Sequence, residues 1–99
     1  MIDDILTQDR RLVILRSLLE CNNDANESIL HDCLDAYGHY VSRDAVRGLI
    51  DWLAEQQLVA IEELRGGFYV VTITSRGQDV AEGRARVSGI KRPRSRSRM

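Results

Sequence analysis

The apolar residues in the first half of the chain recur at helical spacing and predict three helices. The first helix is expected over residues 8–20, and the polar run NNDAN ends it. A second helix follows Asn26, which can cap it, and stops at Gly38. A third helix begins after the cap residue Ser42 and runs to about Gln56. Only GHYV separates the second helix from the Ser42 cap, and this spacing is typical of a helix-turn-helix.

The next pattern is a pair of β-rich runs, LVAIEEL and FYVVTIT, on either side of Gly66 and Gly67. Adjacent glycines readily adopt positive φ, so this pattern predicts a β-hairpin with a two-residue loop. That register pairs Arg65 with Phe68 and places apolar residues on one face, with Glu62 as the single misfit. The apolar members of this face are Leu58, Ala60, Leu64, Tyr69, Val71 and Ile73.

A short final helix is expected after Thr74, which can cap it, and reaches about Gly83. The elements then follow the order helix, helix, helix, strand, strand, helix. The sequence therefore predicts a mainly α protein with a β-hairpin (α+β), arranged as a winged helix-turn-helix. Ninety-nine residues are enough for one such domain with a modest core.

Charge divides the chain into two parts. Residues 84–99 contain seven cations and no acid, which leaves seven cations against all fifteen acids in residues 1–83, a balance of −8. We therefore expect a folded domain over residues 1–83 and a basic, flexible tail over residues 84–99. Such a tail is either a solubilising end or a segment that binds nucleic acid or an acidic protein surface.

The apolar runs are all too short for a membrane span, and the acidic start MIDDILTQDRR lacks the apolar core of a signal peptide. We therefore expect a cytoplasmic protein without membrane contact. In the cytoplasm Cys21 and Cys33 are expected to be free thiols.

The start of the second helix of a helix-turn-helix approaches base edges in the major groove of DNA. Here that position is occupied by Ser42, Arg43 and Arg47, and arginine can read guanine with two hydrogen bonds. An alternative for Arg47 is an ion pair with Asp51 one turn further along the helix.

The wing tip and the tail supply further candidate DNA contacts. Arg65, beside Gly66 and Gly67, can enter a minor groove or touch a phosphate, or it is an ordinary exposed arginine near a turn. The tail candidates are Lys91, Arg92, Arg94, Arg96 and Arg98.

Metal binding and catalysis are not expected. His31 and Cys33 point about 200° apart on a helix, so they cannot share an ion, and we expect a buried Cys33 with His31 and His39 on the surface. The sequence contains no nucleophile–base set, no paired catalytic carboxylates and no phosphate-cradling glycine loop. We expect neither an enzyme nor a cofactor.

Two segments resemble winged-helix regulators of the ArsR and MarR type: SRDAVRGLIDWLAEQQLV and FYVVTITSRGQDVAEG, with its Thr-x-x-Gly helix start. Over nearly the whole chain, DRRLVILRSLLE, NESIL, GHYVSRDAVRGLIDWLAEQ and GRARVSGIKRPR resemble a small family of Mu-like phages and prophages. The resemblance implies a winged helix and double-stranded DNA as the partner. The Cys-x-Cys motif of metal-sensing ArsR proteins is absent, so metal sensing is not implied.

Two hypotheses of function follow. The first is a phage-encoded, DNA-binding transcriptional regulator that acts in the bacterial host cytoplasm. The second is a non-catalytic protein–protein adaptor in phage assembly or host takeover, which docks a phage or host protein on its acidic body. The short final helix offers little apolar surface, so a monomer or a weak homodimer is expected.

Overall fold

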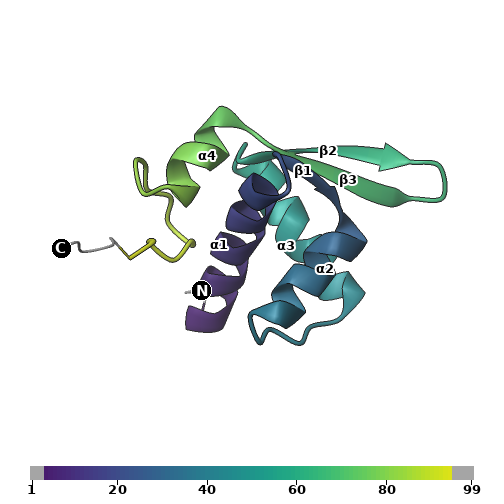
Figure 1. Cartoon of the computed structure of the whole chain (residues 1–99), viewed down its shortest axis with the longest axis horizontal. Helices are drawn as coiled ribbons and strands as arrows, with labels where there is room; N and C mark the ends of the chain where they lie inside the picture. The colour runs from purple at the N-terminus through teal and green to yellow at the C-terminus, as the bar shows by residue number, and fades with distance from the viewer. Residues whose placement is uncertain (1–3, 95–99) are drawn as a thin grey trace.

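Helix α1 (Ile5–Glu20) lies at the centre of the fold, and the other helices pack around it (Figure 1). The computed structural model describes residues 4–94. The helix begins three residues earlier than predicted because the Asp4 side chain caps it, accepting a hydrogen bond of 2.6 Å from the Thr7 N–H. Although α1 is the longest helix in residues 4–94, no helix there is long and apolar enough to span a membrane.

The helix-turn-helix consists of α2 (Glu27–Ala36) and α3 (Arg43–Glu55), as predicted. Their cap residues are the expected ones: Asn26 accepts a hydrogen bond from the Ile29 N–H, and Ser42 accepts one from the Ala45 N–H. Gly38, at φ 85°, turns the chain out of α2. The apolar faces of both helices close over α1. Their buried residues include Leu30, Leu34, Val46, Ile50 and Leu53.

A three-stranded antiparallel sheet packs beside the helices, with the strands in the order β1-β3-β2 (Figure 1). Its strands are β1 (Asp24–Asn26), β2 (Val59–Leu64) and β3 (Phe68–Ile73). Strand β1 was not predicted. Asn22 and Asn23, both at positive φ, reverse the chain after α1 and bring the buried Ala25 opposite Val71. Three residues are too few to show an alternating pattern, so the sequence indicated only a turn.

The hairpin between β2 and β3 forms as predicted, but its register differs by one residue. Leu64 pairs with Phe68, so the loop holds three residues, including Arg65, and not two. Gly66 and Gly67 have the expected positive φ values of 90° and 81°. The Gly67 N–H donates to the Leu64 carbonyl oxygen at 2.9 Å.

The changed register reverses the two faces of β2. Val59 and Ile61, which oppose Ile73 and Val71, pack against the core, whereas Ala60 is exposed. Leu64 is likewise exposed. Glu62 lies on the outer face, so the misfit of the predicted register disappears.

Helix α4 (Ser75–Ala81) follows Thr74, which caps it as predicted, and ends two residues before Gly83. Gly77 allows α4 to pack directly against the backbone of Leu58, the residue before β2. A Cβ atom at Gly77 would stand 2.1 Å from the Leu58 carbonyl oxygen. The Thr-x-x-Gly motif therefore combines a helix cap with a close packing position.

Residues 84–94, here called the strap, return along α1 (Figure 1). The Lys91 N–H donates to the Gln8 carbonyl oxygen at 3.2 Å, and Ile90 is buried in the core cluster. The first part of the predicted flexible tail is therefore packed on the domain. The predicted domain boundary at residue 83 was placed where the charge of the sequence changes. The apolar Ile90, which lies within the basic run, anchors the strap to the core.

Candidate nucleic-acid interface

The turn between α2 and α3 presents the start of α3 to solvent. The N–H groups of Gly38 and His39 donate to the carbonyl oxygens of Asp35 and Leu34, both at 2.9 Å, and close the end of α2. The chain then enters α3 at Ser42, which is exposed together with Arg43. Two predicted contact residues therefore stand on the surface that a helix-turn-helix offers to DNA.

A buried carboxylate lies behind this surface. The Glu27 side chain is only 4% exposed; its Oε1 lies 3.4 Å from Arg43 Nη1, and its Oε2 lies 3.3 Å from Arg47 Nε. The same Oε2 accepts a 3.1 Å hydrogen bond from the Tyr69 N–H. Two guanidinium groups and a backbone donor compensate the buried charge, and the carboxylate joins α2, α3 and β3.

Arg47 connects α3 to the wing. Its Nη2 donates to the Gly67 carbonyl oxygen at 2.8 Å, and its guanidinium carbon lies 4.0 Å from the centre of the Tyr69 ring. Its Nε contact with Glu27 is an ion pair without hydrogen-bond geometry. The Arg47 side chain thus fastens the wing to α3 and is engaged in contacts within the domain.

The alternative ion pair of Arg47 with Asp51 does not form. Asp51 Oδ1 instead accepts a 3.1 Å hydrogen bond from the Tyr69 hydroxyl, and this bond raises the pKa of Tyr69. The two side chains are one helical turn apart, but the tertiary contacts of the wing engage both of them.

The wing tip is open to solvent. Arg65 and Gly66 are exposed, Gly67 is half-buried, and Arg65 has no ion-pair or hydrogen-bond partner within residues 4–94. Leu64 and Phe68, which flank the loop, are 42% and 37% exposed. The tip therefore presents one cation between two apolar side chains.

The outer face of α3 is acidic. Asp44, Asp51 and Glu55, here called the acidic stripe, are exposed on one face of the helix, with Gly48 in the turn between the first two. Glu62 on β2 is also exposed. Arg43 and Arg47 contact Glu27 and not these carboxylates. The centre of α3 therefore repels a polyanion.

The strap supplies the other candidate cations, of which the structure describes three. Arg92 and Arg94 are exposed, whereas the half-exposed Lys91 pairs with Asp9, its Nζ 3.4 Å from Oδ1. Arg96 and Arg98 lie outside the described residues.

His39 is buried, contrary to the surface position that the sequence suggested. Its Nε2 lies 2.7 Å from Asp9 Oδ2, and its Nδ1 accepts a hydrogen bond from Arg10 Nε, so the neutral ring carries its proton on Nε2. Burial alone would raise the pKa of Asp9, but the His39 hydrogen bond and the Lys91 charge outweigh it and lower that pKa.

Cys33, which the sequence suggested to be buried, is only half-buried. No group of three metal-ligating side chains occurs in residues 4–94.

Sequence reasoning missed Glu27. Glu27 looked like an ordinary acid at a helix start, and no local pattern shows that two arginines from another helix meet it.

The helix order, the exposed start of α3 and the hairpin beside it define a winged-helix protein. Solved structures that share this fold include two that match most of this chain. One is F93 from STIV, a winged-helix DNA-binding protein, with a TM-score of 0.60 and 24% identity over 72% of this chain and 77% of that chain. The other is Bordetella bronchiseptica BpsR, whose DNA binding is regulated by 6-hydroxynicotinic acid, with a TM-score of 0.59 and 23% identity over 82% of this chain and 58% of that chain.

The chain belongs to the family of the uncharacterized protein gp26 of Escherichia phage Mu. The two sequences are 81% identical over 97 residues, which span 98% of this chain and all of the Mu protein. An uncharacterized protein of Haemophilus influenzae is 55% identical over 73 residues, 74% of this chain and 72% of its own length. No family model matches the chain. The resemblance to Mu-like phage proteins is thereby confirmed.

Proposed function

We propose that this protein is a double-stranded-DNA-binding transcriptional regulator of a Mu-like phage that acts in the host cytoplasm. One observation carries the proposal: the hydrogen bond from Arg47 to Gly67 fixes the wing beside the exposed start of α3. A winged helix contacts DNA through such a helix and wing together, and a fixed geometry avoids the free-energy cost of ordering them on binding.

Each exposed residue has a role in this proposal. Ser42 and Arg43 approach base edges in the major groove, where arginine reads guanine. Arg65 enters the adjacent minor groove, and the small residues Gly66 and Gly67 let the backbone come close. Arg47 acts as a positioning residue. The proposal assigns no catalytic residue and requires no cofactor.

The ArsR- and MarR-type resemblance and the DNA-binding proteins that share the fold support a regulatory role. The two solved structures are 24% and 23% identical to this chain, so their likeness shows the fold alone. The chain is proposed to bind as a monomer or a weak homodimer.

A second function is favoured by the acidic stripe. Carboxylates at Asp44, Asp51 and Glu55 repel DNA phosphates but suit a basic surface on a phage or host protein. In that case the protein is a non-catalytic adaptor, and α3 is its docking helix.

Enrichment from a random duplex pool tests the first function. We expect the full chain to select a preferred site and to bind it more tightly than a scrambled duplex of equal length. In the R43A/R65A variant this preference should fall about tenfold or more, because one base contact discriminates by about 1–3 kcal/mol. The matched control is R76A, which removes an exposed α4 arginine that donates to the Gln56 carbonyl. A full chain that binds no duplex even at low salt would contradict the DNA function and leave the adaptor.

A further inference from the structure

We propose that the strap is a folded phosphate-binding surface for duplex DNA, separate from α3 and the wing. This inference rests on the proposed function, because it takes duplex DNA as the ligand. The strap and the wing tip lie at opposite ends of the molecule in Figure 1. Phosphate contacts on the strap would therefore add to those of α3 without sharing its surface.

The strap backbone is held in place by contacts that do not use its exposed cations. Arg11, which is buried, donates from Nη1 to the Gly89 carbonyl oxygen at 2.9 Å and stacks on Trp52 with its guanidinium carbon 3.8 Å from the ring centre. Gly89 has a φ of 98°, and a Cβ there would lie 2.8 Å from Trp52 Cζ2. Together with the buried Ile90, these contacts fix the loop before any ligand binds.

The cations of the loop differ in whether they are already neutralised. Arg84 donates to Asp79 at 3.0 Å and also pairs with Glu82, and Lys91 pairs with Asp9. Arg86 and Arg92, by contrast, are exposed and have no ion-pair or hydrogen-bond partner within residues 4–94. These two guanidinium groups therefore keep their full charge for a ligand.

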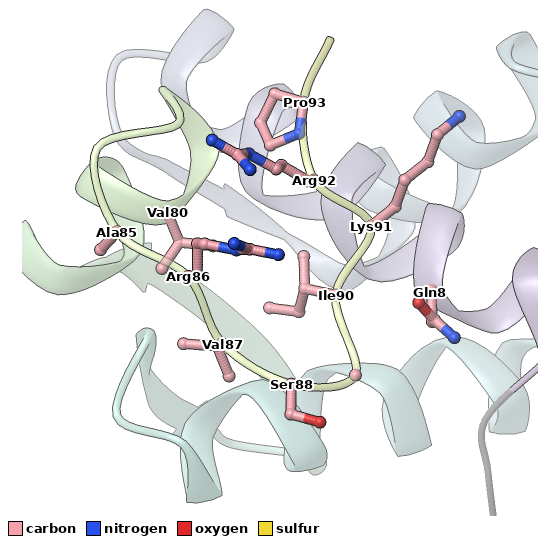
Figure 2. Close-up of a pocket in the computed structure, with 11 residues that line it drawn as sticks. Gln8, Val80, Ala85, Arg86, Val87, Ser88, Ile90, Lys91, Arg92 and Pro93 are labelled. Carbon is pink, nitrogen blue, oxygen red and sulfur yellow. The ribbon is translucent and has the colours of Figure 1, made fainter.

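The two free arginines border one pocket, shown in Figure 2. It has a volume of about 590 Å³, and it has no acidic side chain in its lining. The Arg86 side chain extends across the loop toward Ile90, Arg92 comes from the opposite arm, and Lys91 points away. Two guanidinium groups at a pocket without acidic side chains suit a phosphate group, because a phosphate accepts several charge-assisted hydrogen bonds.

A row of cations continues beyond this pocket. Arg92 also borders a second hollow, together with Arg16 of α1 and Arg94. Glu20 and Glu82 lie at the same hollow, but Glu82 is paired with Arg84. Arg16, Arg86, Arg92 and Arg94 line these two hollows and have no ion-pair or hydrogen-bond partner within residues 4–94. Four such cations exceed what a single small anion needs, so the repeated phosphates of a duplex backbone are the better match.

The test is binding of a random-sequence duplex by the full chain and its variants over about 50–200 mM salt. In R86A/R92A we expect affinity to fall about tenfold and the slope of log K against log salt to fall by about 1.8, because each neutralised phosphate contributes about 0.9. The matched control is R76A, since Arg76 is an exposed arginine of α4 that lines neither hollow, and this variant should bind like the wild type. Gly89→Ala keeps every charge but displaces the loop from Trp52, so it should also weaken duplex binding.

Each contrary result has a distinct meaning. If the wild type binds duplex and R86A/R92A matches its affinity and slope, the strap proposal is wrong while the DNA function stands. If Gly89→Ala binds like the wild type, the cations act without the folded loop, and the proposed folded surface is wrong. If the wild type binds inorganic phosphate but no duplex, the pocket is a small-anion site, and both proposals fail.

Discussion

Gly77→Ala is expected to destabilise the protein by about 3 kcal/mol, because the added methyl group overpacks a rigid contact. Its Cβ would lie 2.1 Å from the Leu58 carbonyl oxygen and 2.8 Å from Ile73 Cγ1. The first neighbour is backbone, and it already accepts hydrogen bonds from the N–H and hydroxyl of Thr74. The Leu58 carbonyl cannot move aside without shifting the backbone between α3 and β2.

Thermal unfolding followed by circular dichroism measures the effect. For a domain of this size, 3 kcal/mol corresponds to a decrease in Tm of about 12–24 °C. The matched control is Gly48→Ala, another helical glycine, where a Cβ meets no atom within 4 Å. Alanine is the better helix former, so this control should gain about 0.5–1 kcal/mol. Equal Tm values for the two variants would contradict the described packing of α4.

Glu27→Gln is expected to lower the free energy of unfolding by about 2 kcal/mol. This loss is smaller than that for a fully buried ion pair, because Arg43 and Arg47 are partly exposed. Glutamine keeps the shape and an acceptor for the Tyr69 N–H but removes the charge that holds both guanidinium groups. The same change should strengthen non-specific duplex binding, since Arg43 and Arg47 lose their internal counter-charge.

Urea unfolding and duplex binding check the two parts of this prediction. Glu55→Gln is the matched control, since Glu55 is exposed and has no ion-pair or hydrogen-bond partner within residues 4–94. That variant should change stability by no more than about 0.5 kcal/mol. Similar stability losses in both variants would mean that the Glu27 carboxylate does not join the helices and the wing.

The helix caps show what the sequence could predict. Asn26, Ser42 and Thr74 cap their helices as expected, because a cap depends on residues within one turn. The hairpin itself was also predictable, but its register was not, because two- and three-residue loops both accept Gly66 and Gly67. Glu62, the single misfit in the predicted face, was the sign that the register was wrong.

The candidate site was less predictable because tertiary contacts decide it. The spacing of Arg47 and Asp51 suits an ion pair along the helix, but Glu27 and Tyr69, distant in sequence, engage the two side chains instead. The strap reads as a charged, low-complexity segment, and only its contacts with Arg11 and Trp52 reveal a packed loop. Which cations are neutralised cannot be counted from composition.

In the proposed complex, duplex DNA contacts the start of α3 and the wing tip. The most direct measurement is an NMR titration of the ¹⁵N-labelled full chain with the enriched duplex. We predict the largest amide shifts at Ser42, Arg43 and the loop residues 65–67, with a second group in the strap. Shifts confined to the strap, or no shifts at all at low salt, would contradict the claim that this winged helix reads DNA through α3 and its wing.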